Sequence, residues 1–204
     1  MSMKSLFTLA ISTLFLTSCY TNLKELDREV RVRIVDNMSI SIENHGNSTF
    51  HEYLNETQYR EEFLRGLRSD LQGKKVIIDN QNPEFEVLLG NLTIVESTRV
   101  DTINDASSPD NGKIFELSKL ELSASGSMKR ISDGKSFSWS ADKSKSESTT
   151  SLRSAAQIAA GENKDKNEYR EKAFDSGEPA DLTQKVGERA GSMIVRDLIG
   201  EINN

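Results

Sequence analysis

Residues 120–141, LELSASGSMKRISDGKSFSWSA, decide how this chain folds. Apolar and polar side chains alternate on both sides of Asp133-Gly134, a pattern typical of two strands that each bury one face. An Asp-Gly pair between two such runs favours a β-hairpin, because both central positions of a type I′ turn need a positive φ. We therefore expect an antiparallel hairpin at this place.

Further strands are predicted upstream of the hairpin. Residues 30–42 alternate between apolar and polar side chains, and the parity breaks at Asp36-Asn37, which indicates a bend or bulge. The apolar run at 76–78 is typical of a short buried strand. Residues 85–95 change parity at Gly90, which predicts one long strand with a bulge at that glycine.

Two amphipathic helices are predicted, because apolar side chains recur every three or four residues over 59–71 and over 182–198. Asn55 or Thr57 is expected to cap the first helix, and Gly73 to end it as a C′ residue. Both helices can lie on one face of a sheet. The predicted fold class is therefore α+β, a two-layer sandwich of a mostly antiparallel sheet with two amphipathic helices on one face.

The composition suits one folded domain and excludes some partners. The 204 residues carry a formal net charge of −6, which argues against nucleic acid, because binding phosphates needs a concentrated excess of Lys and Arg. We expect a single α+β domain over residues 29–204. Within its polar segment 143–178, residues 143–150 can extend the second strand of the hairpin, and the remainder is expected to be solvated and variable in shape.

The first residues have the organisation of a secretion signal. Lys4 supplies a positive start, and residues 6–16 carry no charge but are too few to cross a bilayer. The end of this segment, Leu16-Thr17-Ser18-Cys19, resembles the lipobox of bacterial lipoproteins. That resemblance implies a signal peptide over residues 1–18 and cleavage between Ser18 and Cys19. The alternative is an ordinary signal peptide in which the cysteine is incidental.

The lipoprotein resemblance also implies a role for Cys19. In that family the thiol receives a diacylglyceryl group, and the freed amino group is then acylated, for example with palmitate. Residues 19–28 would then be a lipidated tether, and two or three acyl chains would anchor it stably. Because Cys19 is the sole cysteine, no thiol would remain for disulfides, thiolate chemistry or cysteine-based zinc sites.

The mature part carries a second resemblance. The strands around Asp133-Gly134, with their Trp139-Ser140 ending, look like those of periplasmic lipoproteins related to the curli-secretion lipoprotein, and of lipoprotein activators of penicillin-binding proteins. The helix ending at Gly73 and the strands within 76–90 follow the same order. The polar stretch 144–175 departs from that pattern, and the lack of an obvious membrane-inserting hairpin pair counts against a pore. Accessory lipoproteins of lipid-transport and lipopolysaccharide-assembly systems resemble this order equally well.

Neither catalytic nor metal-binding residues are expected. His45 and His51 lie in a loop without a helical spacing, which favours solvated side chains over a metal or acid–base site. The acidic loop 101–113 lacks the alternate spacing and glycine of a calcium loop. Trp139 is a candidate interface residue, because interfaces favour Trp, although a core position is the commoner one for such a residue.

These observations predict a non-enzymatic accessory lipoprotein of the bacterial cell envelope. It would dock a partner protein of an envelope assembly or transport system through a sheet edge or the segment 143–175. No cofactor is expected apart from the covalent lipid on Cys19. An Asp directly after the cysteine would resemble an inner-membrane retention signal. This chain has Tyr20 there, which favours the outer membrane with the domain facing the periplasm. The alternative is an envelope ligand-binding protein or hydrolase with a pocket between the helices and loop 101–113.

Overall fold

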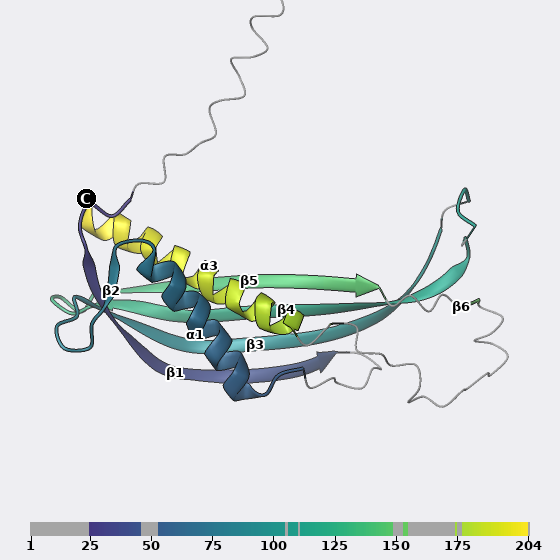
Figure 1. Cartoon of the computed structure of the whole chain (residues 1–204), viewed down its shortest axis with the longest axis horizontal. Coiled ribbons are helices and arrows are strands. Elements are labelled where there is room, and N and C mark those ends of the chain that lie inside the picture. Colours follow the sequence, from purple (N-terminus) through teal and green to yellow (C-terminus); the bar gives the residue numbers. More distant parts are fainter. Residues whose placement is uncertain are drawn as a thin grey trace, which may run out of the picture.

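A curved sheet with two helices packed on one of its faces forms the structure (Figure 1). This computed structural model describes residues 25–45, 53–104, 106–109, 111–148, 153–154, 174 and 177–203. The predicted α+β class, with both helices on one face of the sheet, is confirmed.

The sheet is mixed. Its strands are β1 (Val30–His45), β2 (Val76–Ile78), β3 (Phe85–Thr102), β4 (Lys113–Arg130), β5 (Ser136–Ser148) and β6 (Arg153–Ser154). Their order is β2-β1-β3-β4-β5, and β6 pairs with β4. Strands β3, β4 and β5 pair antiparallel, whereas β1 runs parallel to both β2 and β3. The parallel pairs arise because helix α1 (Glu56–Gln72) returns the chain to the end of the sheet where β1 began.

Both predicted bulges are confirmed. The β1–β3 register shifts between Asp36 and Ser39, and the β3–β4 register shifts between Leu89 and Asn91. Glycine suits the second bulge, because a Cβ at Gly90 would lie 2.9 Å from the carbonyl oxygen of Ser125. The buried strand expected at 76–78 is instead a short edge strand, since β2 has β1 as its only neighbour in the sheet order.

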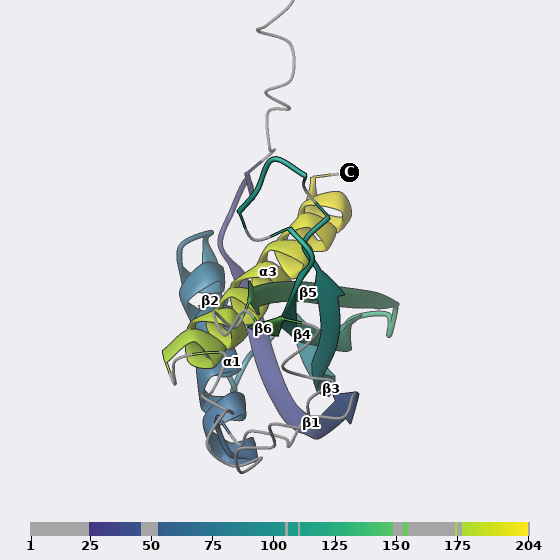
Figure 2. The ribbon, with the colours of Figure 1, turned by 90° about the vertical axis from the view of Figure 1, so that its right-hand side faces the viewer.

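The helices α1 and α3 (Gly177–Ile202) occupy the same side of the sheet (Figure 2). Asn55 caps α1 as predicted: its side-chain oxygen accepts a hydrogen bond from the backbone N–H of Gln58 at 2.9 Å. Gly73 follows the last helical residue, but with a right-handed φ of −68°. Gly73 therefore ends α1 as predicted, but without the left-handed conformation common at such a position; the left-handed residue is Lys75, with φ 59°.

Glycines let the two helices approach each other at backbone distance. A Cβ at Gly66 of α1 would lie 2.0 Å from the carbonyl oxygen of Gln184, and a Cβ at Gly187 of α3 would lie 2.1 Å from that of Phe63. Neither distance is compatible with a side chain at these positions. The core between helices and sheet is built from buried side chains of both layers, among them Val32, Phe63, Leu67, Leu92, Ile94, Leu122, Trp139, Ile194 and Leu198.

The predicted hairpin joins β4 to β5, but its turn differs from the expected type I′. Only Gly134 has a positive φ, of 74°, and Asp133 does not. The carboxylate of Asp133 instead accepts a hydrogen bond from the backbone N–H of Lys135 at 3.0 Å, which favours a longer connection between the strands. Residues 143–148 of the expected polar segment continue β5.

Candidate functional site

The chain enters and leaves the domain at one end, which we call the tether end: residues 25–31, 75–84, 130–135 and 201–203. The side chain of Leu26 is only 2% exposed. The side-chain nitrogen Nδ2 of Asn203 donates to the backbone carbonyl oxygen of Glu25 at 3.0 Å. Nζ of Lys75 donates to the backbone carbonyl oxygen of Leu26, also at 3.0 Å. Residues 25–28 of the predicted tether therefore contact the folded domain, while Ser18 and Cys19 lie outside the described residues.

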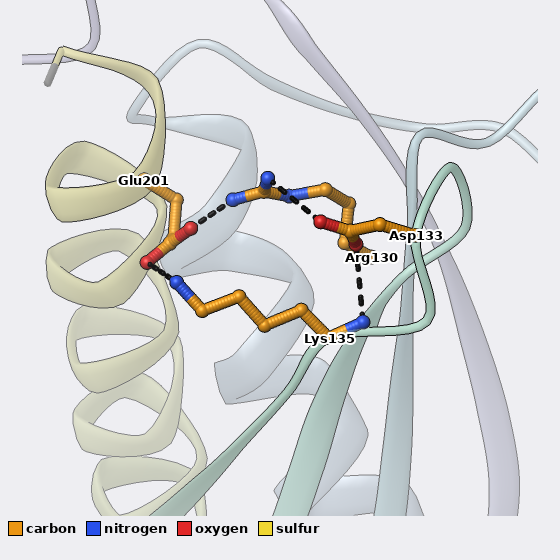
Figure 3. A network of polar contacts seen from close by, with 4 residues as sticks. All are labelled: Arg130, Asp133, Lys135 and Glu201. Carbon is orange, nitrogen blue, oxygen red and sulfur yellow. Dashed lines mark hydrogen bonds and ion pairs between the residues drawn. The ribbon is translucent and has the colours of Figure 1, made fainter.

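Charged side chains connect the β4–β5 turn to the last turn of α3 (Figure 3). Glu201 forms ion pairs with Arg130 and with Lys135, the second at 2.8 Å. Arg130 also contacts Asp133 at 3.2 Å, on the other side of the same turn. One carboxylate of α3 thus holds both strands of the hairpin in place.

A second group of ion pairs joins the incoming segment to the turn before β3. Both guanidinium nitrogens of Arg28 bind the carboxylate of Glu84, at 2.9 and 2.5 Å. This hydrogen bonding lowers the pKa of Glu84 and raises that of Arg28. The pKa of Asp79 is also lowered, mainly because its carboxylate accepts hydrogen bonds from the backbone N–H groups of Gln81 and Asn82.

A groove of about 510 Å³ lies between these two groups of ion pairs. The guanidinium carbon of Arg130 lies 5.9 Å from the ring centroid of Phe85, so this cation also covers the adjacent aromatic ring. The groove is lined by Arg28, Pro83, Glu84, Phe85, Arg130, Ile131, Ser132, Glu201 and Ile202.

A shallower groove, of about 580 Å³, crosses the middle of the sheet. Hydroxyls surround it: besides Gly90 and Gly126, its lining includes Ser125, Ser127, Ser138 and Ser140. Trp139 packs over Gly126, where a Cβ would lie 2.4 Å from the indole ring, and is 4% exposed. Trp139 therefore occupies the core, and a role for it in an interface stays a prediction.

Sequence reasoning missed a buried acid at the opposite end of the sheet. Glu96 is 1% exposed, and the hydroxyl of Tyr53 donates to its carboxylate at 3.4 Å. Burial, together with the charge of Glu96, raises the pKa of Tyr53 and raises that of Tyr59 to about 12. Phe174 packs edge-on against Tyr53, with ring centroids 5.8 Å apart. The signal was present in the sequence, because Glu96 shares the parity of the apolar residues at 92 and 94.

The histidines and the acidic loop that were weighed as metal or acid–base sites lie as follows. His45 is exposed at the end of β1, with Nε2 3.1 Å from Glu43, while His51 lies outside the described residues. The two grooves described above do not involve residues 101–113. Within the described part, no three His, Cys, Asp or Glu side chains form a group that could hold a metal ion, and none of the helices is long and apolar enough to span a membrane.

Comparison with known proteins gives similarity in structure only. The sequence matches no protein-family profile and no curated protein. A candidate neuraminyllactose-binding hemagglutinin homolog from Helicobacter pylori is similar, with a TM-score of 0.43, 15% identity and coverage of 86% of each chain. Rare lipoprotein B from Shewanella oneidensis has a TM-score of 0.35 and 12% identity, over 82% of this chain and 98% of that one.

A candidate lipoprotein from Caulobacter crescentus is also similar, with a TM-score of 0.28 and 13% identity, over 79% of this chain and 90% of that one. At such low identities and TM-scores, none of these similarities indicates what the chain binds. The chain is thus distantly similar in structure to bacterial lipoproteins.

Proposed function

We propose that this protein is a non-enzymatic accessory lipoprotein of the bacterial cell envelope, anchored by lipid on Cys19 and docking a partner protein of an envelope assembly or transport system. The observation that carries the proposal is the coincidence of a signal segment, the lipobox spacing and the only cysteine of the chain. The start of the ordered domain supports it, because Leu26 is buried only seven positions after Cys19. The domain would be held close to the membrane, in our proposal the periplasmic face of the outer membrane.

The edge of β5 is the proposed docking surface. The backbone N–H of Arg130 donates to the carbonyl oxygen of Lys135 at 2.8 Å, so these two residues form a hydrogen-bonded antiparallel pair. Such pairs alternate along the strands, and the backbone groups of Ser138 and Ser140 therefore point away from β4. In the described part of the chain, no strand pairs with β5 on that side.

The first half of this edge has features that suit an added strand. Residues 136–141 carry no charge and no proline, the two devices that commonly block pairing at a sheet edge. Beyond them, Lys143 and Lys145 point toward the helix side of β5, and Lys145 pairs with Glu178 of α3. An extended segment of a partner could therefore extend the sheet at residues 136–141 by backbone hydrogen bonds.

Affinity capture of the tagged protein from detergent-solubilised envelopes, with mass spectrometry of co-purifying proteins, tests this function. Ser140→Pro removes an N–H that faces the open edge and leaves the β4 ladder intact, so it should fold yet lose the partner. Ser140→Ala is the matched control, because it changes the side chain and keeps the backbone donor. If Ser140→Pro is misfolded, Ser138→Pro replaces it.

Three outcomes would contradict the proposal. Capture of the same partner by the folded proline variant at the wild-type level would show that the partner does not bind this edge. An intact mass of the purified protein without diacylglyceryl and acyl groups would show that Cys19 is not the anchor. Full partner capture in cells by a soluble Cys19→Ala variant would show that anchoring does not matter for docking.

A further inference from the structure

The two large hydrophobic side chains that are exposed in the described part of the chain both lie at the tether end. Ile131 is 46% exposed in the β4–β5 turn, and Ile77 is 38% exposed in β2. Outside residues 98–100 and 113–117, the other large hydrophobic side chains in the described ranges are buried or half-buried. Their common location therefore needs an explanation beyond the ordinary scatter of single apolar residues on a surface.

Backbone hydrogen bonds connect the positions of these two isoleucines. The N–H of Ile131 donates to the carbonyl oxygen of Glu84 at 2.9 Å, and the N–H of Glu84 donates to that of Arg31 at 2.8 Å. Arg31 is in turn the register partner of Ile77. Ile77 and Ile131 thus lie at the same end of the sheet, with the segments of Arg31 and Glu84 between them, and Figure 1 shows the C-terminus and the start of β1 at that end.

The length of chain before the domain limits where this end can lie. Only five residues separate Cys19 from Glu25. A fully extended chain advances about 3.5 Å per residue, so Glu25 lies within about 20 Å of a lipidated Cys19. The opposite end of the sheet, where α1 begins at Glu56, is separated from it by the length of the strands (Figure 1).

Most charges at the tether end are paired with a charge of the opposite sign, and Asp27 and Glu29 add two exposed carboxylates. Arg28 pairs with Glu84, and Arg31 pairs with Asp79 at 3.2 Å. The cations of the β4–β5 turn pair with Glu201 and with the carboxylate of the turn itself (Figure 3). Paired charges of both signs present no block of like charge to the headgroups.

We propose that the tether end rests on the membrane surface, with Ile77 and Ile131 in the headgroup region and the β3–β4 connection pointing away from the bilayer. The inference rests on the proposed lipid anchor and adds an orientation to it. The occupant of this surface is the lipid bilayer, because the short tether brings the bilayer to this end whatever partner binds elsewhere. Apolar side chains that enter the interface add to the binding that the acyl chains supply.

Site-directed fluorescence on the full-length lipoprotein tests the orientation. Ile131→Cys, Ile77→Cys and, as the control at the opposite end, Glu56→Cys are each labelled with nitrobenzoxadiazole. The proteins are reconstituted into vesicles of phosphatidylethanolamine and phosphatidylglycerol that contain no other protein. We expect a blue-shifted emission and a severalfold slower quenching by aqueous iodide at positions 77 and 131 than at position 56.

Equal quenching at positions 131 and 56 in the anchored protein would overturn the orientation. The wild-type protein separates this failure from a failure of the anchor. Its only cysteine is Cys19, so a lipidated protein takes up no thiol-reactive label. Labelling of the wild type would show a free thiol, which would overturn the anchor and the orientation together, whereas an unlabelled wild type with equal quenching at 131 and 56 overturns the orientation alone.

Discussion

Replacing Gly187 by alanine tests the close approach of the two helices. The new Cβ would lie 2.1 Å from the carbonyl oxygen of Phe63 and 2.8 Å from the backbone nitrogen of Leu67. Both obstacles are backbone atoms of α1, so no flexible side chain can move aside. To reach an acceptable contact the helices must separate by roughly 1 Å, a gap that forfeits a quarter to a half of the dispersion attraction between facing atoms.

The magnitude follows from two opposing terms. Overpacking of a well-packed core costs about 1–3 kcal/mol and occasionally more, and a backbone clash belongs at the upper end of that range. The higher helix propensity of alanine returns about 1 kcal/mol. We expect Gly187→Ala to lower the free energy of unfolding by about 2 kcal/mol, which at a urea m-value of about 2 kcal/mol/M shifts the midpoint down by about 1 M.

Urea unfolding followed by far-ultraviolet circular dichroism measures this shift. Gly200→Ala is the matched control in the same helix, because a Cβ there meets nothing within 4 Å. The control should unfold at the same or a slightly higher urea concentration, since it gains helix propensity without a clash. A midpoint for Gly187→Ala equal to or above that of the wild type would refute the backbone contact between α1 and α3.

Three further predictions concern single elements. Asn55→Ala removes the capping-box hydrogen bond that the Asn55 side chain accepts from the backbone N–H of Gln58, and should lower the free energy of unfolding by about 1 kcal/mol, measured by urea unfolding. Trp139→Ala should cost about 3–5 kcal/mol, because the indole covers Gly126 in the core; an unchanged thermal midpoint would contradict that packing. The pKa of Glu84 lies below its ordinary value of 4.5, so the pair with Arg28 stabilises the fold above that pH and is lost as the pH falls through the lowered pKa. The urea midpoints of wild type and Glu84→Gln should therefore differ slightly at pH 6 and converge as the pH falls below the lowered pKa; a difference that grows on acidification would contradict the pairing.

Most of the elements followed from local patterns. Alternation of apolar side chains identified the long strands and placed bulges at Asp36-Asn37 and at Gly90, because a one-residue insertion must reverse the parity of a strand. Turn conformations were harder to predict. Asp133-Gly134 suggested a type I′ turn, but the carboxylate of Asp133 binds the backbone of Lys135 and favours a longer connection.

The exposed residues of the tether end were harder to predict from the sequence. Ile77 lies in a run of three apolar residues that indicated a buried strand, and only the strand order shows that β2 is at an edge. Nothing local distinguishes Ile131 from a core residue either. Burial of a side chain depends on which segments lie beside it, and those neighbours come from distant parts of the chain.

The sequence alone determined the amphipathic helices, the alternating strands and the acidic balance, and it carries the resemblance of residues 16–19 to a lipobox. These properties depend on composition and on spacings of a few residues, which can be read directly from the linear sequence. Tertiary structure decided the rest. It placed β1 parallel to β3, brought Glu201 to the β4–β5 turn, and gathered the chain ends, Ile77 and Ile131 at one end of the sheet. The physical reason is that such contacts arise from chain topology and close packing, which join residues far apart in sequence and leave no local pattern.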